Sequence, residues 1–255
     1  MGDKNRYCSE LWSYIKKNFR KGIEIIYPST CPICSQVLDK KFNKKNYICE
    51  QCSKKLSYIE SPRCLKCGKP VDNAETEFCY DCSRVKHIYS QGVGVWAYTN
   101  EIKNSIYQFK YHNKREYGEF YGYEVKNRYE SIIKSWNADV LIPVPLHKSK
   151  LRKRGYNQAE IIAKSIGTFL DIPVDSQLLN RKKKTLAQKE LNDKERLKNL
   201  ENAFIIGEKV VKYKNVIIVD DIYTTGTTID ACSKILIDAG VAKVYYISLC
   251  IGKGF

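Results

Sequence analysis

Long hydrophobic runs are missing from this sequence of 255 residues. No stretch approaches the roughly 20 apolar residues that a membrane-spanning helix needs, so no transmembrane segment is expected. The first residues also lack the apolar core of a secretory signal peptide, and a cytoplasmic location is therefore expected. The sequence contains no G-x-x-x-x-G-K-[ST] motif, which counts against a P-loop nucleotide site.

Acidic residues are few in comparison with basic ones. Aspartate and glutamate number 28 against 44 lysines and arginines, which gives a formal net charge of +16 and a pI near 9.2. A charge of this sign implies a polyanionic partner, either nucleic acid, a phosphorylated ligand or an acidic membrane, but does not choose among them. With 43% hydrophobic residues the chain can still bury a core, and its length suits one or two domains.

Eight of the eleven cysteines form four C-x-x-C pairs. One such turn presents two thiolates to a metal ion, and two turns complete a tetrahedral site with four cysteines. Two structural zinc ions are therefore expected in preference to disulfides or redox pairs, with iron–sulfur clusters as a minor alternative. Sequential pairing of the turns is the preferred arrangement, and a cross-braced one stays open. The expected metal ligands are Cys31, Cys34, Cys49, Cys52, Cys64, Cys67, Cys79 and Cys82.

A helical pattern precedes the cysteines. Between residues 7 and 26 apolar side chains recur on one stripe, and lysine and arginine fill much of the remainder. Such a helix can make peripheral contact with an anionic membrane, although docking on its own protein or a partner is more common. The predicted organisation is an N-terminal amphipathic helix at 1–30, a double zinc-ribbon module at 31–86 and a larger domain at 87–255. The module is short and polar, so its zinc is expected to be structural.

The larger domain alternates strand and helix patterns, which predicts an α/β fold with a mainly parallel sheet flanked by helices. Buried strands are expected at 93–98, 138–147 and 216–219, and a strand near the sheet edge at 241–252. Helices are expected at 102–111, 119–135 and 157–170, and after residue 228. The basic segment 178–204 shows no strong apolar face and is expected to be a functional lid or a disordered loop.

The stretch 216–230, VIIVDDIYTTGTTID, carries the most specific pattern. Its apolar run ends at Asp220 and Asp221, and a hydroxyl-rich turn then opens into a helix. Ligands bind beyond the carboxyl ends of the strands in open α/β sheets, where a helix N-terminus offers N–H donors to phosphate. The acids would repel that phosphate, so ribose hydroxyls or a ligand-borne magnesium ion suit them. The expected phosphate loop consists of Thr224, Thr225, Gly226, Thr227 and Thr228.

The strand at 138–147 repeats this order, because the basic loop KSKLRKRGYNQ and a helix follow it. Cationic side chains and a glycine backbone at a helix N-terminus can hold an anion, although most charged loops are simply solvated. Basic residues of the 178–204 segment, Lys184 among them, can close over a pyrophosphate and neutralise it. The candidates for the pyrophosphate side are Lys150, Arg152, Arg154, Gly155, Asn157, Arg181 and Lys183.

In combination these motifs resemble the ComF family of competence proteins, ComFC type. VPLH, RGYNQAE, T-x-x-Q, R-x-x-N-x-x-x-AF and VDDIYTTGTT occur in this order after a cysteine-rich N-terminus. The resemblance implies a fold similar to type I phosphoribosyltransferases, with 5-phosphoribosyl-1-pyrophosphate (PRPP) and magnesium as ligands. It places Asp220 and Asp221 at the ribose hydroxyls and the threonine loop at the 5-phosphate. Lysine stands at 150 and 183, where arginine is the expected residue, and lacks its bidentate geometry.

The resemblance also implies a role in DNA uptake during natural transformation, with single-stranded DNA as a ligand and a ComFA-like helicase as partner. The inner face of the membrane is then the expected place. Tyrosines interleaved with lysine are candidates for base stacking, although core packing is expected for at least half of them. These are Tyr107, Tyr111, Tyr117 and Tyr121.

Two other functions stay open at this point. One is a metabolic phosphoribosyltransferase that acts on a nucleobase, and the other a PRPP-sensing regulatory or scaffold protein. If transfer occurs, it is displacement at the ribose C1 carbon with departure of pyrophosphate. The sequence names neither a general base nor the acceptor, which the region 88–136 is expected to select. Enzyme activity is therefore left undecided.

Overall fold

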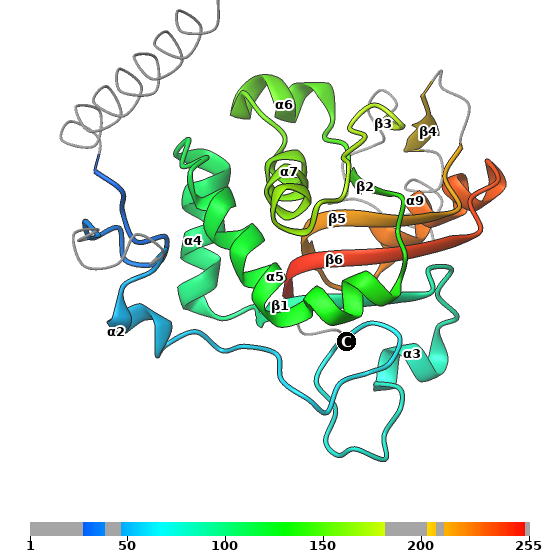
Figure 1. Cartoon of the computed structure of the whole chain (residues 1–255), viewed down its shortest axis with the longest axis horizontal. Coiled ribbons are helices and arrows are strands. Elements are labelled where there is room, and N and C mark those ends of the chain that lie inside the picture. The colour runs from blue at the N-terminus through cyan, green and yellow to red at the C-terminus, as the bar shows by residue number, and fades with distance from the viewer. Residues whose placement is uncertain (1–27, 39–46, 182–202, 208–211, 253–255) are drawn as a thin grey trace, which may run out of the picture. The chain divides into compact units, whose positions relative to one another are not determined.

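The computed structural model describes residues 28–38, 47–181, 203–207 and 212–252 (Figure 1). The chain divides into two compact units, Met1–Lys55 and Leu56–Phe255. The predicted amphipathic helix at 7–26 lies outside the described residues, as do Lys183, Lys184 and most of the 178–204 segment. The boundary between the units falls inside the segment assigned to the zinc-ribbon module, so the two halves of that module belong to different units. The proposed three-part organisation stays a prediction.

The first unit contains a tight cysteine turn and one short helix among its described residues. An antiparallel bridge joins Thr30 to Val37, and the turn between them is closed by hydrogen bonds from Cys31 N to Gln36 O and from Ser35 N to Cys31 O, 2.8 and 2.9 Å long. The helix α2 (Glu50–Ser53) begins directly after Cys49. These short elements bury little apolar surface, in keeping with a segment that depends on metal.

The second unit is built on a four-stranded parallel sheet with the order β1-β6-β5-β2. The strands are β1 (Gln91–Ala97), β2 (Val140–Pro143), β5 (Asn215–Tyr223) and β6 (Lys243–Ile251). Runs of β-branched residues such as those of β5 are expected where a strand is buried on both faces. The parallel sheet predicted from the sequence is confirmed.

The strand β6 is central in the sheet, and the prediction that it lies near an edge is wrong. The alternation of apolar and polar residues in β6 suggested that one face of the strand is solvated, but every residue after Lys243 is buried. The polar groups are satisfied internally, because Tyr246 Oη donates to Cys67 O at 2.7 Å and Ser248 Oγ donates to Cys250 O at 3.2 Å. Buried hydroxyl groups with such partners are compatible with a core strand.

Helices cover both faces of the sheet. The helices are α3 (Tyr80–Arg84), α4 (Asn100–Tyr111), α5 (Tyr117–Ser135), α6 (Lys148–Arg154), α7 (Gln158–Leu170) and α9 (Thr227–Asp238). Side chains alternate between the faces of a strand, and Val216 and Ile218 share one core cluster with Leu236 of α9 and three cysteines of the second half of the module. The helices α5 and α7 pack on each other, and α7 packs on β2 and β5.

Three local features differ from the expectations. The strand β5 continues through the acid pair to Tyr223, so both acids lie within it. The basic loop after β2 contains the helix α6. The described ends of the 178–204 segment form β3 (Leu179–Arg181) and β4 (Phe204–Ile206), which pair antiparallel. The region 88–136 supplies β1 to the main sheet in addition to α4 and α5. Among the helices that the structure describes, none combines the length and apolar character needed to cross a bilayer.

Candidate functional site

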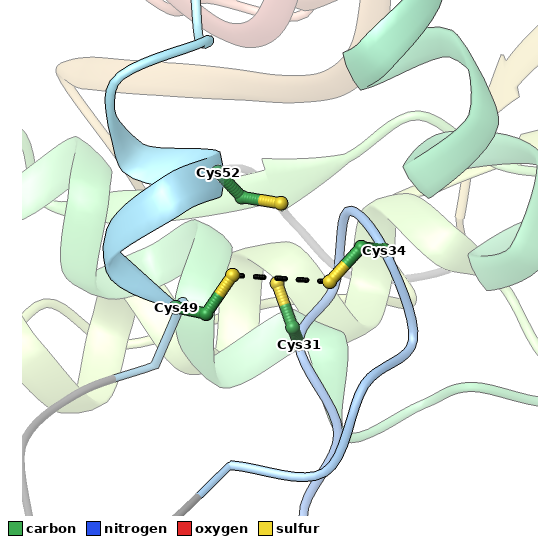
Figure 2. A group of neighbouring side chains, drawn as sticks. All are labelled: Cys31, Cys34, Cys49 and Cys52. Carbon is green, nitrogen blue, oxygen red and sulfur yellow. Dashed lines mark hydrogen bonds between the residues drawn. The ribbon is translucent and has the colours of Figure 1, made fainter.

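Two groups of four cysteines are assembled as the sequential pairing predicts. Within each group the sulfur atoms lie within 4.8 Å of one another, and Figure 2 shows the first group. Thiolates about 2.3 Å from one zinc ion are about 3.8 Å apart in a tetrahedron. The measured Sγ separations of 3.8 Å for Cys34–Cys49 and 3.5 Å for Cys67–Cys79 fit that geometry. The described cysteines form no disulfide. The groups are Cys31, Cys34, Cys49 and Cys52, and Cys64, Cys67, Cys79 and Cys82.

The second cluster is the more deeply buried. Cys64 and Cys67 are 3% and 0% exposed, whereas Cys34 of the first cluster is exposed. Its turn is closed by hydrogen bonds from Gly68 N to Cys64 O and from Cys64 N to Lys69 O, 2.9 and 2.8 Å long. Cys67 N also approaches Cys64 Sγ at 3.5 Å, which favours the thiolate that a metal requires. The residues present therefore fit a structural zinc ion.

A separate cavity of about 170 Å³, the acid-pair cavity, lies at the carboxyl ends of β2 and β5. It combines residues from α4, α6, α7, β3, β5 and α9, far apart in the sequence. Six of the predicted site residues line it together with Thr228 of the phosphate loop: Lys150, Arg154, Asn157, Arg181, Asp220 and Asp221. Arg152 and Gly155 are exposed and do not line it, and Lys183 lies outside the described residues.

The acid pair is held in an asymmetric environment. Asp221 forms an ion pair with Lys110 of α4, and its backbone N–H donates to Asp220 Oδ1 at 2.8 Å. Burial, with the neighbouring charge of Asp221, raises the pKa of Asp220 to about 7. Lys110 also lines the cavity, although the sequence pattern assigned it no role. It stands at the end of a helix more than a hundred residues from the acids, and nothing in its local spacing indicated the contact.

Basic side chains lie in the same cavity as the acids. Burial lowers the pKa of Lys150, and the positive charges of Arg181 and Arg154 lower it further. Burial likewise lowers the pKa of Arg181. Clustered cations whose charged forms are disfavoured in this way gain stability from a bound anion. The basic side of the cavity is therefore suited to pyrophosphate or a similar group.

Arg154 and Asn157 are fixed by their neighbours. Arg154 donates to Gln158 Oε1 at 2.8 Å and to Tyr111 Oη at 3.0 Å. Asn157 is the N-cap of α7, where its Oδ1 accepts from Ala159 N at 3.2 Å while its Nδ2 donates to Val144 O at 3.0 Å. Its side chain thus holds the end of β2 against the helix and serves mainly to shape the cavity wall.

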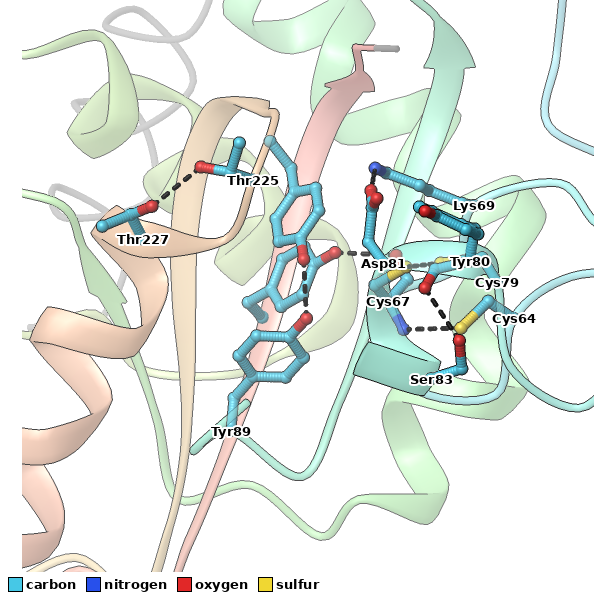
Figure 3. Close-up of polar contacts among 12 residues, drawn as sticks. Cys64, Cys67, Lys69, Cys79, Tyr80, Asp81, Ser83, Tyr89, Thr225 and Thr227 are labelled. Atoms are coloured by element: carbon cyan, nitrogen blue, oxygen red, sulfur yellow. Dashed lines mark hydrogen bonds and ion pairs between the residues drawn. The ribbon is translucent and has the colours of Figure 1, made fainter. Parts of the chain in front are cut away.

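The threonine turn leads from β5 into α9 as predicted. Gly226 is the N-cap of α9 with φ of 80°, and the cap contributes no side-chain hydrogen bond to the helix. A Cβ atom there would lie 2.7 Å from Tyr223 Oη and 2.8 Å from His87 Cε1, so both the conformation and the close approach require glycine. Thr225 and Thr227 bond to each other through their hydroxyls at 2.8 Å (Figure 3). The helix N-terminus is thus left with its own N–H groups to offer an anion.

An aromatic cleft of about 360 Å³ adjoins the acid-pair cavity through Lys110, which lines both. Tyr107 and Tyr111 are 51% and 50% exposed on α4, whereas Tyr117 and Tyr121 are buried. The expectation that at least half of these tyrosines pack in the core is confirmed. The cleft is lined by Tyr98, Asn100, Lys103, Asn104, Ile106, Tyr107, Lys110 and Tyr111.

A larger cavity of about 580 Å³ lies beside α5, away from the acid pair. Its arginines are engaged already, because Arg128 lies 3.3 Å from the centre of the Tyr58 ring and Arg63 lies 4.9 Å from that of Tyr129. It contains none of the residues selected by the sequence motifs. The smaller acid-pair cavity is therefore the better candidate site.

A segment near the N-terminus, residues 22–83, matches a known domain family. The family model described as the double zinc ribbon domain matches residues 22–83, which contain all eight clustered cysteines. A likeness to the purine phosphoribosyltransferase of Pyrococcus horikoshii Ot3 covers 52% of this chain and 87% of that one, at 15% identity and a TM-score of 0.31. The parallel sheet and its flanking helices are established here from the strand pairing itself.

Curated relatives are named as competence proteins or as DNA utilization proteins. The chain is 38% identical over 108 residues to competence protein F of Haemophilus influenzae, covering 42% of this chain and 47% of that protein. It is 34% identical over 112 residues to DNA utilization protein YhgH of Escherichia coli O157:H7, covering 44% and 49%. Competence protein ComFC of Bacillus subtilis is 28% identical over 159 residues, with 60% of each chain covered.

The alignments span about half the length of the first of these relatives. The family model covers the cysteine-rich part of the chain at residues 22–83. The resemblance predicted from the motifs is confirmed: the chain is similar to competence protein F and to ComFC, and its residues 22–83 match the double zinc ribbon domain.

Proposed function

We propose that the chain acts in DNA uptake by binding PRPP with magnesium in the acid-pair cavity and single-stranded DNA in the aromatic cleft. The observation that carries the proposal is the charge distribution in one cavity. Two carboxylates of β5 and the cations Lys150, Arg154 and Arg181 line it together, beside the N-terminus of α9. PRPP is a ligand with the matching order of groups, because a ribose with hydroxyls joins a phosphate to a pyrophosphate.

Each part of the ligand has a physical counterpart. The N–H groups at the start of α9 and the threonine hydroxyls suit the 5-phosphate. The carboxylates of Asp220 and Asp221 suit the ribose hydroxyls, and the three cations suit the pyrophosphate. Magnesium prefers oxygen ligands from phosphates and carboxylates and would enter with the pyrophosphate. Lys110 neutralises Asp221 in the absence of ligand, so PRPP binding requires Asp221 to exchange Lys110 for the sugar or the metal.

Single-stranded DNA is proposed for the aromatic cleft because aromatic rings and cations alternate there. The rings of Tyr107 and Tyr111 are 5.0 Å apart, and the Arg154 guanidinium lies 4.9 Å from the Tyr111 ring centre. Base stacking on exposed aromatic rings, with lysines following the backbone, is the usual mode of binding single strands. By resemblance to ComF proteins, a ComFA-like helicase at the inner face of the membrane would be the partner in this role.

The PRPP assignment can be tested by calorimetric titration of the full chain with PRPP in excess magnesium. Pyrophosphate and ribose 5-phosphate are the comparison ligands. PRPP is expected to bind at least tenfold more tightly than either fragment, since only PRPP occupies the acid pair and both anion sites together. Equal affinity for PRPP and pyrophosphate would reduce the site to a simple anion pocket and refute the assignment.

PRPP binding should also depend on pH through Asp220. Because the pKa of Asp220 in the fold is about 7, raised chiefly by burial, its ionised fraction grows from about one-tenth at pH 6 to about nine-tenths at pH 8. The carboxylate binds magnesium and accepts hydroxyl bonds more strongly than the neutral acid does, so affinity is expected to rise by up to about tenfold over this range. The same shift destabilises the ligand-free fold as the pH rises from about 4 to about 7, where the unfolded chain loses the proton that folded Asp220 still holds.

The matched control for this pH dependence is Asp220→Asn, which cannot ionise. Titration of PRPP itself affects both proteins equally, so the ratio of their affinities isolates the carboxylate. That ratio is expected to change with a midpoint near pH 7. A ratio that stays constant from pH 6 to pH 8 would show that Asp220 does not act through its charge.

Phosphoribosyl transfer to a base is a second candidate, favoured by the position of the aromatic cleft next to the acid pair. In that reaction the acceptor nitrogen would form a bond to the ribose C1 carbon while the bond to pyrophosphate breaks, with magnesium and the cations stabilising the departing group. Incubation with PRPP and a panel of nucleobases, followed by measurement of pyrophosphate release, separates the two cases. Release that depends on one base would indicate an enzyme, and binding without release would indicate a ligand-sensing role.

A further inference from the structure

We propose that the second cysteine cluster positions the phosphate loop, so that metal binding there sets the affinity for a phosphate-bearing ligand. The first cluster has no such role in the proposal. The inference rests on the proposed function for the identity of the ligand, but its structural part concerns only the conformation of residues 224–230. The link consists of a linker clamp, a row of tyrosines and a shared core.

The clamp is formed by the linker that follows the second cluster. His87 Nδ1 bonds to Asp230 Oδ2 at 2.7 Å, and Ile88 N donates to Asp230 Oδ1 at 2.8 Å. Asp230 lies in the first turn of α9, and both of its carboxylate oxygens are thus held by the linker. His87 is 5% exposed, and its Cε1 lies 2.8 Å from the position that a Cβ atom at Gly226 would take. The linker therefore contacts the start of α9 in two places, at the N-cap Gly226 and in the first helical turn at Asp230.

Three tyrosines connect the cluster to the end of β5, and Figure 3 labels one of them, Tyr89, together with cysteines of the cluster. Tyr246 Oη donates to the backbone oxygen of Cys67 at 2.7 Å. The Tyr246 ring stacks on that of Tyr223, with centroids 4.8 Å apart and 5° between the planes. Tyr223 Oη in turn bonds to Tyr89 Oη at 2.7 Å. Since Tyr223 directly precedes the threonine turn, the cluster backbone is two side chains away from the loop.

The cluster also packs on the sheet without intervening space. Gly92 N in β1 donates to Lys66 O of the cysteine turn at 2.8 Å. A Cβ atom at Gly92 would lie 1.9 Å from the Tyr246 ring, so any side chain would displace the tyrosine that binds Cys67. Lys69 forms an ion pair with Asp81 and lies 6.0 Å from the Tyr223 ring centre. Densely packed groups of this kind transmit a displacement to their neighbours.

The two clusters differ in their surroundings. Cys64, Cys67 and Cys79 belong to the same core cluster as Ile229 and Cys232 of α9. The first cluster belongs to the other compact unit, Met1–Lys55. Small modules whose ligands are cysteine thiolates fold only with metal. Loss of metal from the second cluster would therefore release the clamp and the tyrosine row, and the phosphate loop would lose its fixed conformation. Phosphate binding would then have to order the loop, and the entropy cost of this ordering would weaken the affinity.

The experiment compares two double variants of the full chain, Cys64→Ser/Cys67→Ser and, as the matched control, Cys31→Ser/Cys34→Ser. Zinc content, PRPP affinity in magnesium, and amide hydrogen exchange at residues 224–230 are measured in each. Each variant is expected to lose one of two zinc ions. The second-cluster variant is expected to lose at least tenfold in PRPP affinity with faster exchange in the loop, and the control to stay within about twofold of the parent. Equal losses in both variants, or unchanged loop exchange after loss of the second zinc, would overturn the proposal.

A milder pair of variants covers the case in which the second-cluster variant fails to fold. Tyr246→Phe removes the bond to Cys67 but retains the ring and all eight cysteines. Tyr245→Phe is its matched control. The ring of Tyr245 stacks on Trp136, with centroids 4.7 Å apart. With both zinc ions retained, only Tyr246→Phe should speed loop exchange and weaken PRPP binding, by about threefold or more. Indistinguishable behaviour of the two variants would count against the link.

Failure of this inference can be told apart from failure of the proposed function. If the parent protein binds no PRPP, the ligand assignment fails, and exchange at residues 224–230 still reports whether the second zinc orders the loop. If the parent binds PRPP and the second-cluster variant binds equally well, the ligand assignment stands and the coupling fails.

Discussion

The double variant Asp220→Asn/Asp221→Asn is expected to bind PRPP in magnesium at least tenfold more weakly than the parent, a loss of about 1.4 kcal/mol or more. Asparagine keeps the shape of each side chain but removes the negative charge that holds magnesium or accepts hydroxyl bonds. It also leaves Lys110 without its partner Asp221. Calorimetric titration at pH 8, where Asp220 is mainly ionised, gives the largest difference.

The control for the acid pair is Asp238→Asn, because Asp238 is an exposed acid at the far end of α9. The affinity of the Asp238→Asn variant for PRPP should equal that of the parent. The single variant Asp221→Asn adds a second check, since the charge of Asp221 helps to raise the pKa of Asp220. Removing that charge should shift the pH dependence of binding to lower pH. Unchanged affinity in the double variant would refute the assigned ribose site.

Single-stranded DNA is expected to bind with an affinity that falls about 100-fold between about 50 mM and 200 mM salt. The estimate assumes contact with about five phosphates and a slope of about −0.7 per contact for single strands. The net charge of +16 and the lysines that line the aromatic cleft favour such contacts. Fluorescence anisotropy with a labelled oligonucleotide across a salt series measures the slope. Absent binding, or binding that does not respond to salt, would remove the nucleic-acid part of the proposal.

Variants of the aromatic cleft separate stacking from charge. Tyr107→Ala/Tyr111→Ala should weaken binding by about 1–3 kcal/mol per stacked base without changing the salt slope. Lys103→Ala should instead reduce the slope by about 0.7. Tyr80→Ala is the control for a lost exposed ring, since Tyr80 is 61% exposed on α3, outside the cleft. If Tyr80→Ala weakens binding as much as the cleft variant, the DNA path does not run through the cleft.

The parts of the site that could be predicted are those encoded in short, continuous segments. The strand, acid pair, threonine turn and helix occur within 15 consecutive residues, 216–230, so their relative geometry follows from the conformation of one βα unit. The C-x-x-C turns are equally local, which is why their spacing predicted both clusters. The convergence of Lys150 and Arg154 on the acids also followed, because carboxyl ends of parallel strands meet at one edge. Arg181 was selected instead from the basic segment after residue 178, and it lies in the antiparallel strand β3.

Other features depended on contacts between distant segments. The central position of β6 in the sheet could not be predicted from its alternating apolar and polar residues, because Tyr246 and Ser248 find their hydrogen-bond partners only in the folded core. Arg152 and Gly155 were selected from the same loop as Arg154, but α6 directs them to the surface. A charged run does not indicate which of its residues will face a cavity, since that depends on where the helix is placed.

The sequence by itself determined the class of fold, the four-cysteine clusters and the loop that suits a phosphate, because each is specified by the order of neighbouring residues. Only the tertiary structure decided that Lys110 pairs with Asp221, and that Asp230, Tyr223 and Cys67 bond to His87, Tyr89 and Tyr246 respectively. Those contacts join residues separated by more than a hundred positions. Their partners are chosen by the packing of whole elements, which no local pattern encodes.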